Sequence, residues 1–390
     1  MTGMTSVELF AGAGGLGIGL HKAGFHPELV VERDGYCCDT IRENQAREHL
    51  LVRDWRLEPG DVRAVDFRSL EGKLDLISGG PPCQPFSMGG KHKAQADARD
   101  MFPEAVRAVR EARPRAFVFE NVKGLMRASF RNYFEYIRLQ MQYPELVARP
   151  DEDWFEHLAR LERRHTSGVG SDMSYRVVTQ LLNAADHGVP QRRERVLFVG
   201  FREDLDLEFA FPLATHSADA LIWSQFRTGE YWDRHKVATR DRPENSALTA
   251  RAARMEAKPT TVGWQTVRDA LKGLPDPEHD REAARKVANH RFQSGARSYP
   301  GHTGSPLDEP AKTLKAGVHG VPGGENMLLK PTGEVRYFTV RESARLQTFP
   351  DDYVFHGSWT ETMRQLGNAV PVRLAEIVGR QVAHQLRFAA

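Results

Sequence analysis

The amino-acid sequence predicts an α/β fold: a doubly wound parallel sheet with helices on both faces, joined to a smaller and less regular domain. Three observations support this prediction. Short apolar runs alternate with helix-like segments through the first half of the chain. A glycine-rich turn directly follows the first apolar run. After about residue 201 the alternation fades into a stretch rich in Arg, Pro, Gly, Asn and His.

The composition indicates an ordinary soluble protein. Of the 390 residues, 40% are hydrophobic and 27% charged, and no apolar run is long enough to span a membrane. The N-terminus lacks the pattern of a signal peptide, and three cysteines, two of them adjacent, fit a reducing cytoplasm. The net charge of +2 neither demands nor excludes a polyanionic partner, because local patches decide such binding. We therefore expect a cytoplasmic protein that does not bind membranes.

The predicted strands are short apolar runs, several of them bounded by glycine or proline. They are Ser6–Phe10, Leu29–Glu32, Leu74–Ser78, Ala116–Phe119, Tyr175–Leu182 and Arg195–Phe201. Helices are predicted between them, for example over Leu16–Ala23 and Phe102–Ala112. Alternation of this kind favours a doubly wound sheet, and such sheets bind ligands beyond the carboxyl ends of their strands.

The turn FAGAGGLGIGL (10–20) lies between the first strand and a helix, where glycines allow a ligand to approach the backbone closely. A glycine-rich turn without a ligand is the alternative. Glu32, at the end of the second strand, is placed to hold ribose hydroxyls, and Asp61 in a third loop could bond an amino group. No Lys-Ser/Thr follows the glycines, which disfavours a triphosphate-binding loop. The pattern fits a cofactor that contains adenosine.

PPCQPFS (81–87) places Cys83 in a stiff loop after the third predicted strand. A buried structural cysteine is the alternative, but a Pro/Gly loop offers little apolar cover. The following residues include Lys91, His92, Lys93 and Arg99, whose positive charge would lower the pKa of a thiol. The sequence therefore favours a nucleophilic cysteine.

Two further segments bring charged groups to strand ends. FVFENVKG (117–124) places Glu120 at the end of the next strand, where a doubly wound sheet can set it beside the Cys83 loop. In QRRERV (191–196), strand alternation would direct Arg193 and Arg195 to one side, as a guanidinium pair for an oxygen or a phosphate. Solvated surface charges are the alternative for both segments. Cys37 and Cys38 lack partners at zinc spacing, so we expect no metal site.

Six segments in this order resemble the DNA (cytosine-5) methyltransferase family. FAGAGGLG is similar to motif I, PPCQPFS to motif IV with its catalytic cysteine, and ENV to motif VI. QRRERV resembles motif VIII, RESARLQTFP motif IX, and QLGNAVP motif X. The matches run from near Val7 to the C-terminal helix. One such motif is weak, whereas six in order are very specific.

The resemblance implies a Rossmann-like methyltransferase domain over residues 1–201. The 71 positions from Glu120 to Gln191 depart from the compact members of the family and indicate an insertion within 140–174, whose Trp and Leu spacing predicts a helix packed on this domain. A target-recognition domain would occupy residues 202–335. Residues 336–390, with motifs IX and X, would return to the catalytic domain. No large extra domain precedes motif I, which points to a stand-alone prokaryotic enzyme.

The same resemblance assigns roles to residues. Cys83 would attack C6 of cytosine, Glu120 would hold the exocyclic amine and N3, and Arg195 would reach O2, supported by Arg193. The methyl donor would be S-adenosylmethionine. Its predicted binding residues are Phe10, Ala11, Gly12, Gly14, Gly15, Glu32, Arg33, Asp61, Val62, Pro82, Asn368 and Ala369.

The target cytosine would have to be flipped out of double-stranded DNA, because a thiol cannot reach C6 in a stacked duplex. The predicted DNA contacts are Gln84, Ser87, Lys91, Arg99 and Thr313. Residues 281–302 hold five Arg or Lys against one acid, Glu282, which suits a nucleic-acid face.

The sequence thus predicts a site-specific, monomeric DNA cytosine-5 methyltransferase of the prokaryotic nucleoid, the functional partner of a restriction endonuclease. Two alternatives stay open. One is the related tRNA cytosine-5 methyltransferase branch, which shares the cysteine and the cofactor. The other is a catalytically silent DNA-binding regulator, against which the intact Cys83, Glu120 and Arg195 argue.

Overall fold

The computed structural model describes residues 3–82, 100–168, 173–317 and 324–389. The chain folds into two compact units, each built from segments far apart in sequence. The first unit comprises residues 1–182, 194–212 and 375–390. The second comprises residues 183–193 and 213–374. Within the described residues, no helix combines the length and the apolar character that crossing a bilayer requires.

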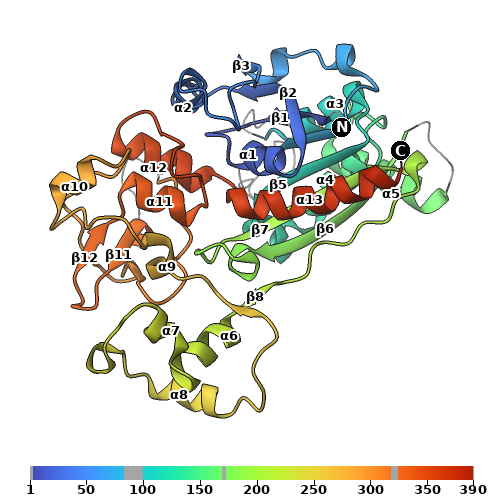
Figure 1. The fold of residues 1–390 in the computed structure, drawn as a ribbon. Helices are drawn as coiled ribbons and strands as arrows, with labels where there is room; N and C mark the ends of the chain where they lie inside the picture. Colours follow the sequence, from blue (N-terminus) through green and yellow to red (C-terminus); the bar gives the residue numbers. More distant parts are fainter. Residues whose placement is uncertain (1–2, 83–99, 169–172, 318–323, 390) are drawn as a thin grey trace. The chain divides into compact units, whose positions relative to one another are not determined.

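A seven-stranded sheet forms the centre of the first unit (Figure 1), in the order β3-β2-β1-β4-β5-β7-β6. The strands are β1 (Met4–Leu9), β2 (Phe25–Glu32), β3 (Leu57–Pro59), β4 (Leu76–Gly79), β5 (Ala116–Val122), β6 (Tyr175–Asn183) and β7 (Glu194–Arg202). All but β3 overlap a predicted strand. The sequence missed β3 because this three-residue edge strand is largely exposed and ends in Pro59, so it forms no apolar run.

The prediction of a parallel sheet is wrong at one strand. β1 to β5 pair in parallel, but β7 runs antiparallel to β5. β7 follows β6 after a short connection that holds only one 3₁₀ turn, Ala184–His187, and no crossover helix. A parallel return needs a longer crossover, so the chain must reverse here. The reversal brings the first residues of β7 to the carboxyl end of β5, where Arg195 is paired with Val122.

Helices cover both faces of this sheet, as the doubly wound fold class predicts (Figure 1). α1 and α13 lie together on one face, since Lys22 Nζ lies 3.2 Å from Glu376 Oε2. α3, α4 and α5 pack on the other face, where their apolar side chains share one buried cluster with the strands. The helices are α1 (Gly15–Lys22), α2 (Gly35–Ala46), α3 (Phe102–Ala112), α4 (Arg131–Gln142), α5 (Trp154–Ser167) and α13 (Val372–Phe388).

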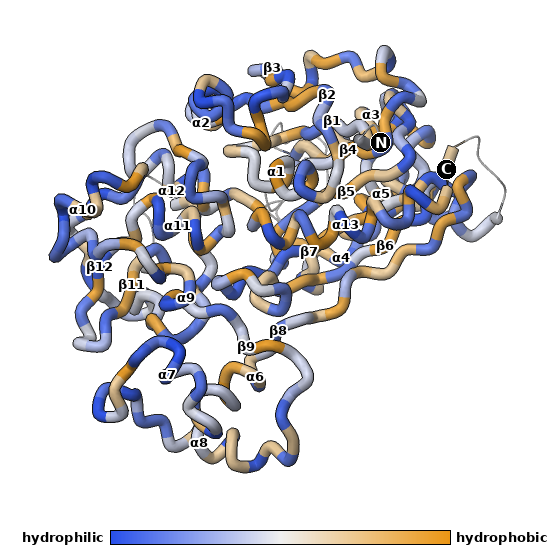
Figure 2. The backbone as a smooth tube through the Cα atoms, viewed as in Figure 1, coloured by the Kyte–Doolittle hydropathy of each residue, from blue (hydrophilic) through white to orange (hydrophobic). Residues whose placement is uncertain are grey.

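Side chains of alternate strand residues face opposite sides of the sheet. Val7 and Leu9 of β1 and Phe117 and Phe119 of β5 join the cluster under α3, α4 and α5. Glu8, between Val7 and Leu9, faces α1 instead and accepts a hydrogen bond from a backbone N–H of that helix. Figure 2 shows the apolar residues concentrated along the strands of this sheet. The period-2 pattern therefore fixes which side chains can meet a ligand and which build the core.

The second unit contains short elements and two small sheets. β10, β11 and β12 form one sheet, and β8 and β9 form the other. Its strands are β8 (His216–Ser217), β9 (Val262–Gly263), β10 (Ser305–Pro306), β11 (Met327–Leu329) and β12 (Val335–Tyr337). Its helices are α6 (Ala218–Ile222), α7 (Glu230–Arg234), α8 (Ser246–Ala253), α9 (Val267–Leu271), α10 (Arg281–Arg285), α11 (Val340–Leu346) and α12 (Trp359–Asn368).

The compact units and the predicted functional domains divide the chain differently. Residues 183–193 and 340–374, which carry motif VIII in part and motifs IX and X, belong to the second unit. The sequence grouped them with the catalytic domain, so the predicted domain boundaries stay a functional hypothesis. The predicted helix within residues 140–174 is present as α5, packed against α4.

Candidate active site at the carboxyl ends of the strands

The glycine-rich turn after β1 has a backbone shape that most residues avoid. Phe10 has a φ of 56°, Gly12 a φ of 56° and Gly14 a φ of 88°, all in the left-handed region. A non-glycine residue held there, as Phe10 is, stores strain of the kind found at ligand sites. A Cβ added to Gly12 would meet no atom within 4 Å. Gly14 is the N-cap residue of α1 and makes no side-chain cap, so the first amides of this helix receive no acceptor from the cap residue.

Glu32, at the carboxyl end of β2, is tied to this turn. Its Oε2 accepts a hydrogen bond from Gly12 N at 2.6 Å, and its Oε1 accepts one from Asp34 N at 2.7 Å. The two amides fix the carboxylate in one orientation. Each oxygen keeps a further lone pair, so the half-buried carboxylate can still accept hydrogen bonds from two hydroxyl groups.

Asp61 lies in the loop after β3 among arginines. Arg63 donates to it from its backbone N at 3.0 Å and from its guanidinium at 2.9 Å, and Arg33 lies 3.7 Å away. The hydrogen bonds from the Arg63 side chain and backbone hold the pKa of this carboxyl well below its ordinary range. Asp61 is therefore a permanently ionised acceptor. Asp61 caps the 3₁₀ turn Val62–Ala64, whose first residue, Val62, is buried.

Cys83, Gln84, Ser87, Lys91 and Arg99 lie outside the described residues, so their predicted roles remain predictions. The residues on either side are described. Asn121 Nδ2 donates to Pro81 O at 2.9 Å, and Met101 N donates to Pro82 O at 3.1 Å. The chain is thus anchored immediately before Cys83 by an amide of β5 and by the start of α3.

Glu120 and Arg195 form a buried ion pair between β5 and β7. Arg195 Nε lies 2.6 Å from Glu120 Oε1, and the exposed fractions of the two side chains are 11% and 9%. A Cβ added to Gly80 would lie 3.3 Å from Glu120 Oε2, so this carboxylate sits directly against the end of β4. Because Cys83 follows three residues after Gly80, the fold brings Glu120 to the segment that carries the cysteine. Such a pair can hold the polar edge of a planar base and help move a proton.

Arg193 does not share this position with Arg195. It precedes β7, belongs to the second unit and is fully buried. Its Nη1 donates to Leu314 O at 3.1 Å and its Nη2 to Gly367 O at 2.8 Å. In the described structure Arg193 therefore joins two backbone segments of the second unit, whereas Arg195 meets a carboxylate.

Two glutamines, for which the sequence suggested no role, connect the C-terminal motifs. Gln191 donates to Leu346 O at 3.3 Å and accepts from Leu314 N at 3.0 Å. Gln347 donates to Leu366 O at 2.5 Å. Both side chains are fully buried. Each glutamine is an uncharged amide within a motif, and such an amide can satisfy backbone groups in a region with few regular strands.

Gly367 is required by close backbone packing rather than by its own φ. A Cβ there would lie 2.2 Å from Ala316 N. Its neighbours in motif X differ: Asn368 is exposed at the end of α12, and Ala369 is buried. Thr313, a predicted DNA contact, donates its hydroxyl to Arg192 O at 2.6 Å. The roles predicted for Asn368, Ala369 and Thr313 stay predictions.

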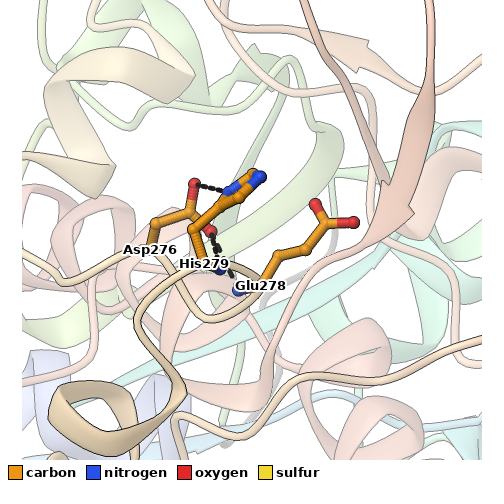
Figure 3. A group of neighbouring side chains, drawn as sticks. All are labelled: Asp276, Glu278 and His279. Atoms are coloured by element: carbon orange, nitrogen blue, oxygen red, sulfur yellow. Dashed lines mark hydrogen bonds and ion pairs between the residues drawn. The ribbon is translucent and has the colours of Figure 1, made fainter.

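One group of potential metal ligands occurs among the described residues, formed by Asp276, Glu278 and His279 (Figure 3). Asp276 accepts from the backbone N of Glu278 at 2.8 Å and bonds His279 Nδ1 at 3.1 Å. Glu278 is paired with Lys330 at 2.5 Å. Since these acids already have partners and the group is largely exposed, it does not support a metal site.

The profile of the family "C-5 cytosine-specific DNA methylase" matches residues 4–143 and 169–384. The unmatched residues 144–168 include all of α5. Over 390 residues the chain is 31% identical to the type II methyltransferase M.PspPI of a Psychrobacter strain, covering 98% of this chain and 80% of that protein. It is 32% identical over 389 residues to M.NgoMIV of Neisseria gonorrhoeae, covering 98% of both.

Solved structures share the fold. A DNA modification methyltransferase encoded within an E. coli prophage superimposes with a TM-score of 0.59 at 21% identity, covering 98% of this chain and 99% of that one. The S. pombe Dnmt2 methyltransferase does so with a TM-score of 0.57 at 17% identity, covering 99% and 100%. With the profile match, the full-length relatives and the strand-end site in agreement, the chain belongs to the C-5 cytosine-specific DNA methylase family and is a DNA cytosine-5 methyltransferase.

Proposed function

We propose that this enzyme methylates cytosine within one short sequence of double-stranded DNA, using Cys83 as its nucleophile and S-adenosylmethionine as the methyl donor. The observation that supports the proposal best is the buried Glu120–Arg195 pair. It lies against Gly80, at the end of the strand that leads to Cys83. A carboxylate and a guanidinium at one strand end can read the amine, N3 and O2 of a single cytosine.

The reaction begins at C6 of the cytosine. The Cys83 thiolate forms a bond to C6, and the electron pair of the 5,6 double bond moves toward C5. C5 would then bond the methyl carbon of the donor, and the electron pair of the broken carbon–sulfur bond would stay on the sulfur of the donor, which would leave as a neutral thioether. A base removes the C5 proton, the bond from sulfur to C6 breaks, and the 5,6 double bond and the thiolate are restored.

Glu120 and Arg195 stabilise the charge that develops during this attack. A carboxylate at the exocyclic amine and N3 favours a proton on N3, which drains electron density from the ring. The Arg195 guanidinium is suited to O2. Because both side chains are largely removed from water, their interactions with the ring are stronger than they would be in solvent.

The turn after β1 fits an adenosine-containing donor. Phe10 offers an aromatic face, Gly12 has open space beside its Cα, and Glu32 keeps lone pairs for two ribose hydroxyls. The ionised Asp61 can accept a hydrogen bond from the adenine amine. When bound, S-adenosylmethionine supplies an electrophilic methyl group. Arg33, Val62, Pro82, Asn368 and Ala369 are proposed to complete this site.

The target base is proposed to leave the duplex, because C6 is inaccessible in a stacked helix. The phosphate backbone would be held by residues after Cys83, including Lys91 and Arg99, and by the second unit around Thr313. Relatives named as type II methyltransferases suggest that this chain protects host DNA from a partner restriction endonuclease. We propose that it acts in the cytoplasm as a monomer.

The proposal is tested by bisulfite sequencing of DNA and tRNA from a methylation-free bacterial host that expresses the chain. We expect protected cytosines in one short DNA sequence and none in tRNA. Cys83→Ser should abolish this protection and keep affinity for the donor and for DNA, because only the nucleophile is lost.

Other outcomes have distinct meanings. Protection confined to a tRNA position would replace DNA by tRNA as the substrate. Protection that persists in Cys83→Ser would exclude the proposed nucleophile. No protection by a folded protein that binds the donor would support a silent DNA-binding regulator.

A further inference from the structure

The α5 segment lies in the internal stretch of the first unit that the family profile does not match. The profile passes from residue 143 to residue 169, and α5 spans Trp154–Ser167. The helix is well built: Asp153 caps it, accepting from Phe155 N and Glu156 N at 2.9 Å, and the Glu156 side chain returns a bond to Asp153 N. These capping hydrogen bonds fix the point at which α5 begins.

α5 packs closely on α4 through aromatic side chains. The ring of Trp154 meets the ring of Tyr133 edge-on, with centroids 6.3 Å apart and an interplanar angle of 86°. It also lies 5.7 Å from the ring of Tyr136. Leu158 and Leu161 enter the main buried cluster of the unit. Contacts of this kind hold α4 and its tyrosines in one orientation.

A hydrogen-bond chain at His157 fixes the same contact. His157 Nε2 lies 2.6 Å from Leu146 O, and Nδ1 lies 2.9 Å from the Tyr136 hydroxyl. A carbonyl can only accept, so Nε2 carries the proton and Nδ1 accepts from Tyr136. Burial lowers the pKa of His157, which favours this neutral form. Each partner is satisfied in only one tautomer, so the α4–α5 contact is specific.

The fixed face of α4 reaches the end of the segment that carries Cys83. The buried Tyr133 donates its hydroxyl to Asp100 Oδ2 at 2.5 Å, and Asp100 Oδ1 accepts from Phe102 N at 3.2 Å. Asp100 directly follows residues 83–99, as Pro82 directly precedes them. Met101 N bonds Pro82 O at 3.1 Å, so the two ends of the segment are joined to each other.

We propose that Tyr133 is a positioning residue for the methyltransfer reaction: held by α5, its hydroxyl fixes Asp100 and so the anchor of the segment that carries Cys83. The inference rests on Cys83 as the proposed nucleophile. It gives the unmatched α5 segment a function, which is to brace the α4 face that holds this anchor. Misplacing a reacting atom by about 1 Å can cost about 10²-fold in rate, so a small error at the anchor would be measurable.

The test uses the full chain and DNA in which the target cytosine carries fluorine at C5. With S-adenosylmethionine present, the methylated adduct then has no C5 proton to lose, so it persists, and its formation rate reports the attack and the methyl transfer together. In Tyr133→Phe the ring and its packing stay while the hydroxyl is lost. We expect adduct formation to slow about tenfold. The affinity for S-adenosylmethionine should stay within about twofold, because the residues proposed to bind the donor do not include Asp100, the described partner of the Tyr133 hydroxyl.

Matched variants separate positioning from general stability. Tyr143→Phe removes another hydroxyl beside α4, bonded to His165 Nδ1 at 3.0 Å and remote from Asp100, and should leave the rate unchanged. Asp100→Ala should slow the attack as much as Tyr133→Phe, and the double variant no further. Asp100→Asn can still bond the Tyr133 hydroxyl and should retain most of the rate.

The proposal is overturned if Tyr133→Phe forms the adduct at the normal rate, or if the effects of Tyr133→Phe and Asp100→Ala simply multiply. A lower melting temperature with an unchanged rate would mean a structural role only. If Tyr133→Phe does not fold, the two Asp100 variants test the proposal instead. Equal adduct-formation rates for Asp100→Ala and Asp100→Asn would then overturn it. Failure of the proposed function looks different: the unmodified chain would then form no adduct, or Cys83→Ser would still methylate DNA.

Discussion

Arg193 and Arg195 are two positions apart in the sequence, yet each serves a different compact unit. Arg195, in the first unit, is paired with Glu120 at 2.6 Å. Arg193, in the second, donates to the carbonyls of Leu314 and Gly367. An arginine side chain thus pairs with a carboxylate at a strand end in the first unit, and in the second unit another arginine donates hydrogen bonds to backbone carbonyls. The groups around each arginine, and not the residue type, therefore determine its role.

The difference reflects how the two regions are built. The strands of the first unit pair with one another in one seven-stranded sheet. The second unit has strands of only two or three residues, and several of its buried polar side chains, such as Gln191 and Arg193, bond to backbone carbonyls. Arg341, for example, is fully buried and donates to Tyr353 O at 2.7 Å and to Pro350 O at 3.0 Å. Buried backbone groups need partners, and side chains supply them here.

The largest effect is expected at the Glu120–Arg195 pair. Glu120→Gln keeps the shape of the side chain but removes the charge that supports a proton on N3. We expect the rate of methyl transfer in a single turnover to fall by roughly 10²–10⁴-fold. Donor affinity and thermal stability should change little. A near-normal rate would exclude a role for Glu120 in proton transfer. The Glu120–Arg195 pair would then have only a structural role, like that of Arg193.

The second effect concerns stability. Arg193→Met keeps the aliphatic stem but leaves two buried carbonyls without their charged donor. We expect the free energy of unfolding of the second unit to fall by about 2–5 kcal/mol, measured by chemical denaturation. Arg192→Ala is the matched control, because Arg192 is about half exposed and paired with Glu309 at 3.1 Å.

An exposed pair of this kind contributes at most about 1 kcal/mol, so Arg192→Ala should unfold almost as the parent does. Equal losses in the two variants would contradict the view that the second unit depends on buried bonds from side chain to backbone.

The third effect is a pH dependence from a buried carboxyl that forms no ion pair with any residue of the described structure. Glu8 is 2% exposed and accepts hydrogen bonds from the Ser78 hydroxyl and from Gly17 N. Burial raises its pKa from 4.5 to about 8. The folded chain therefore holds a proton that the unfolded chain releases above pH 4.5. The stability linked to Glu8 is fully present below that pH and is lost as the pH rises toward 8.

Glu8→Gln removes this titration. Relative to the variant, the parent should lose about 1.4 kcal/mol of stability per pH unit within this window. Melting temperatures of the two proteins, measured from about pH 5.5 to about pH 7.5, should therefore diverge as the pH rises. A constant difference across the range would mean that Glu8 is ionised in the folded protein and has a counter-charge.

Much of the first unit could be predicted from the sequence. The strands β1, β2, β4, β5, β6 and β7 and the helices α1 and α3 overlap their predicted ranges, because apolar runs bounded by turn residues and helical periods are strong local signals. β3 was missed because it carries no such signal. In the second unit the elements are short, so the sequence indicated only an irregular region.

The candidate site shows the same limit. The motifs place Glu32, Glu120 and Arg195 at strand ends, and the structure brings Glu120 and Arg195 together. The sequence also expected Arg193 and Arg195 on one side, but the strand begins at Glu194, so alternation does not reach Arg193. Gln191 and Gln347 were overlooked because a buried amide has no periodicity of its own.

The sequence alone therefore determined the class of sheet, the order of its motifs and the residue types available for chemistry, since these depend on local patterns. Tertiary structure decided the direction of β7, the partner of each arginine, the bond from Tyr133 to Asp100 and the burial of Glu8. Each of these depends on groups far apart in the chain that meet only after folding. Hydrogen-bond partners and local solvation are consequently set by the fold, and it is they that decide whether a charged side chain serves catalysis or structure.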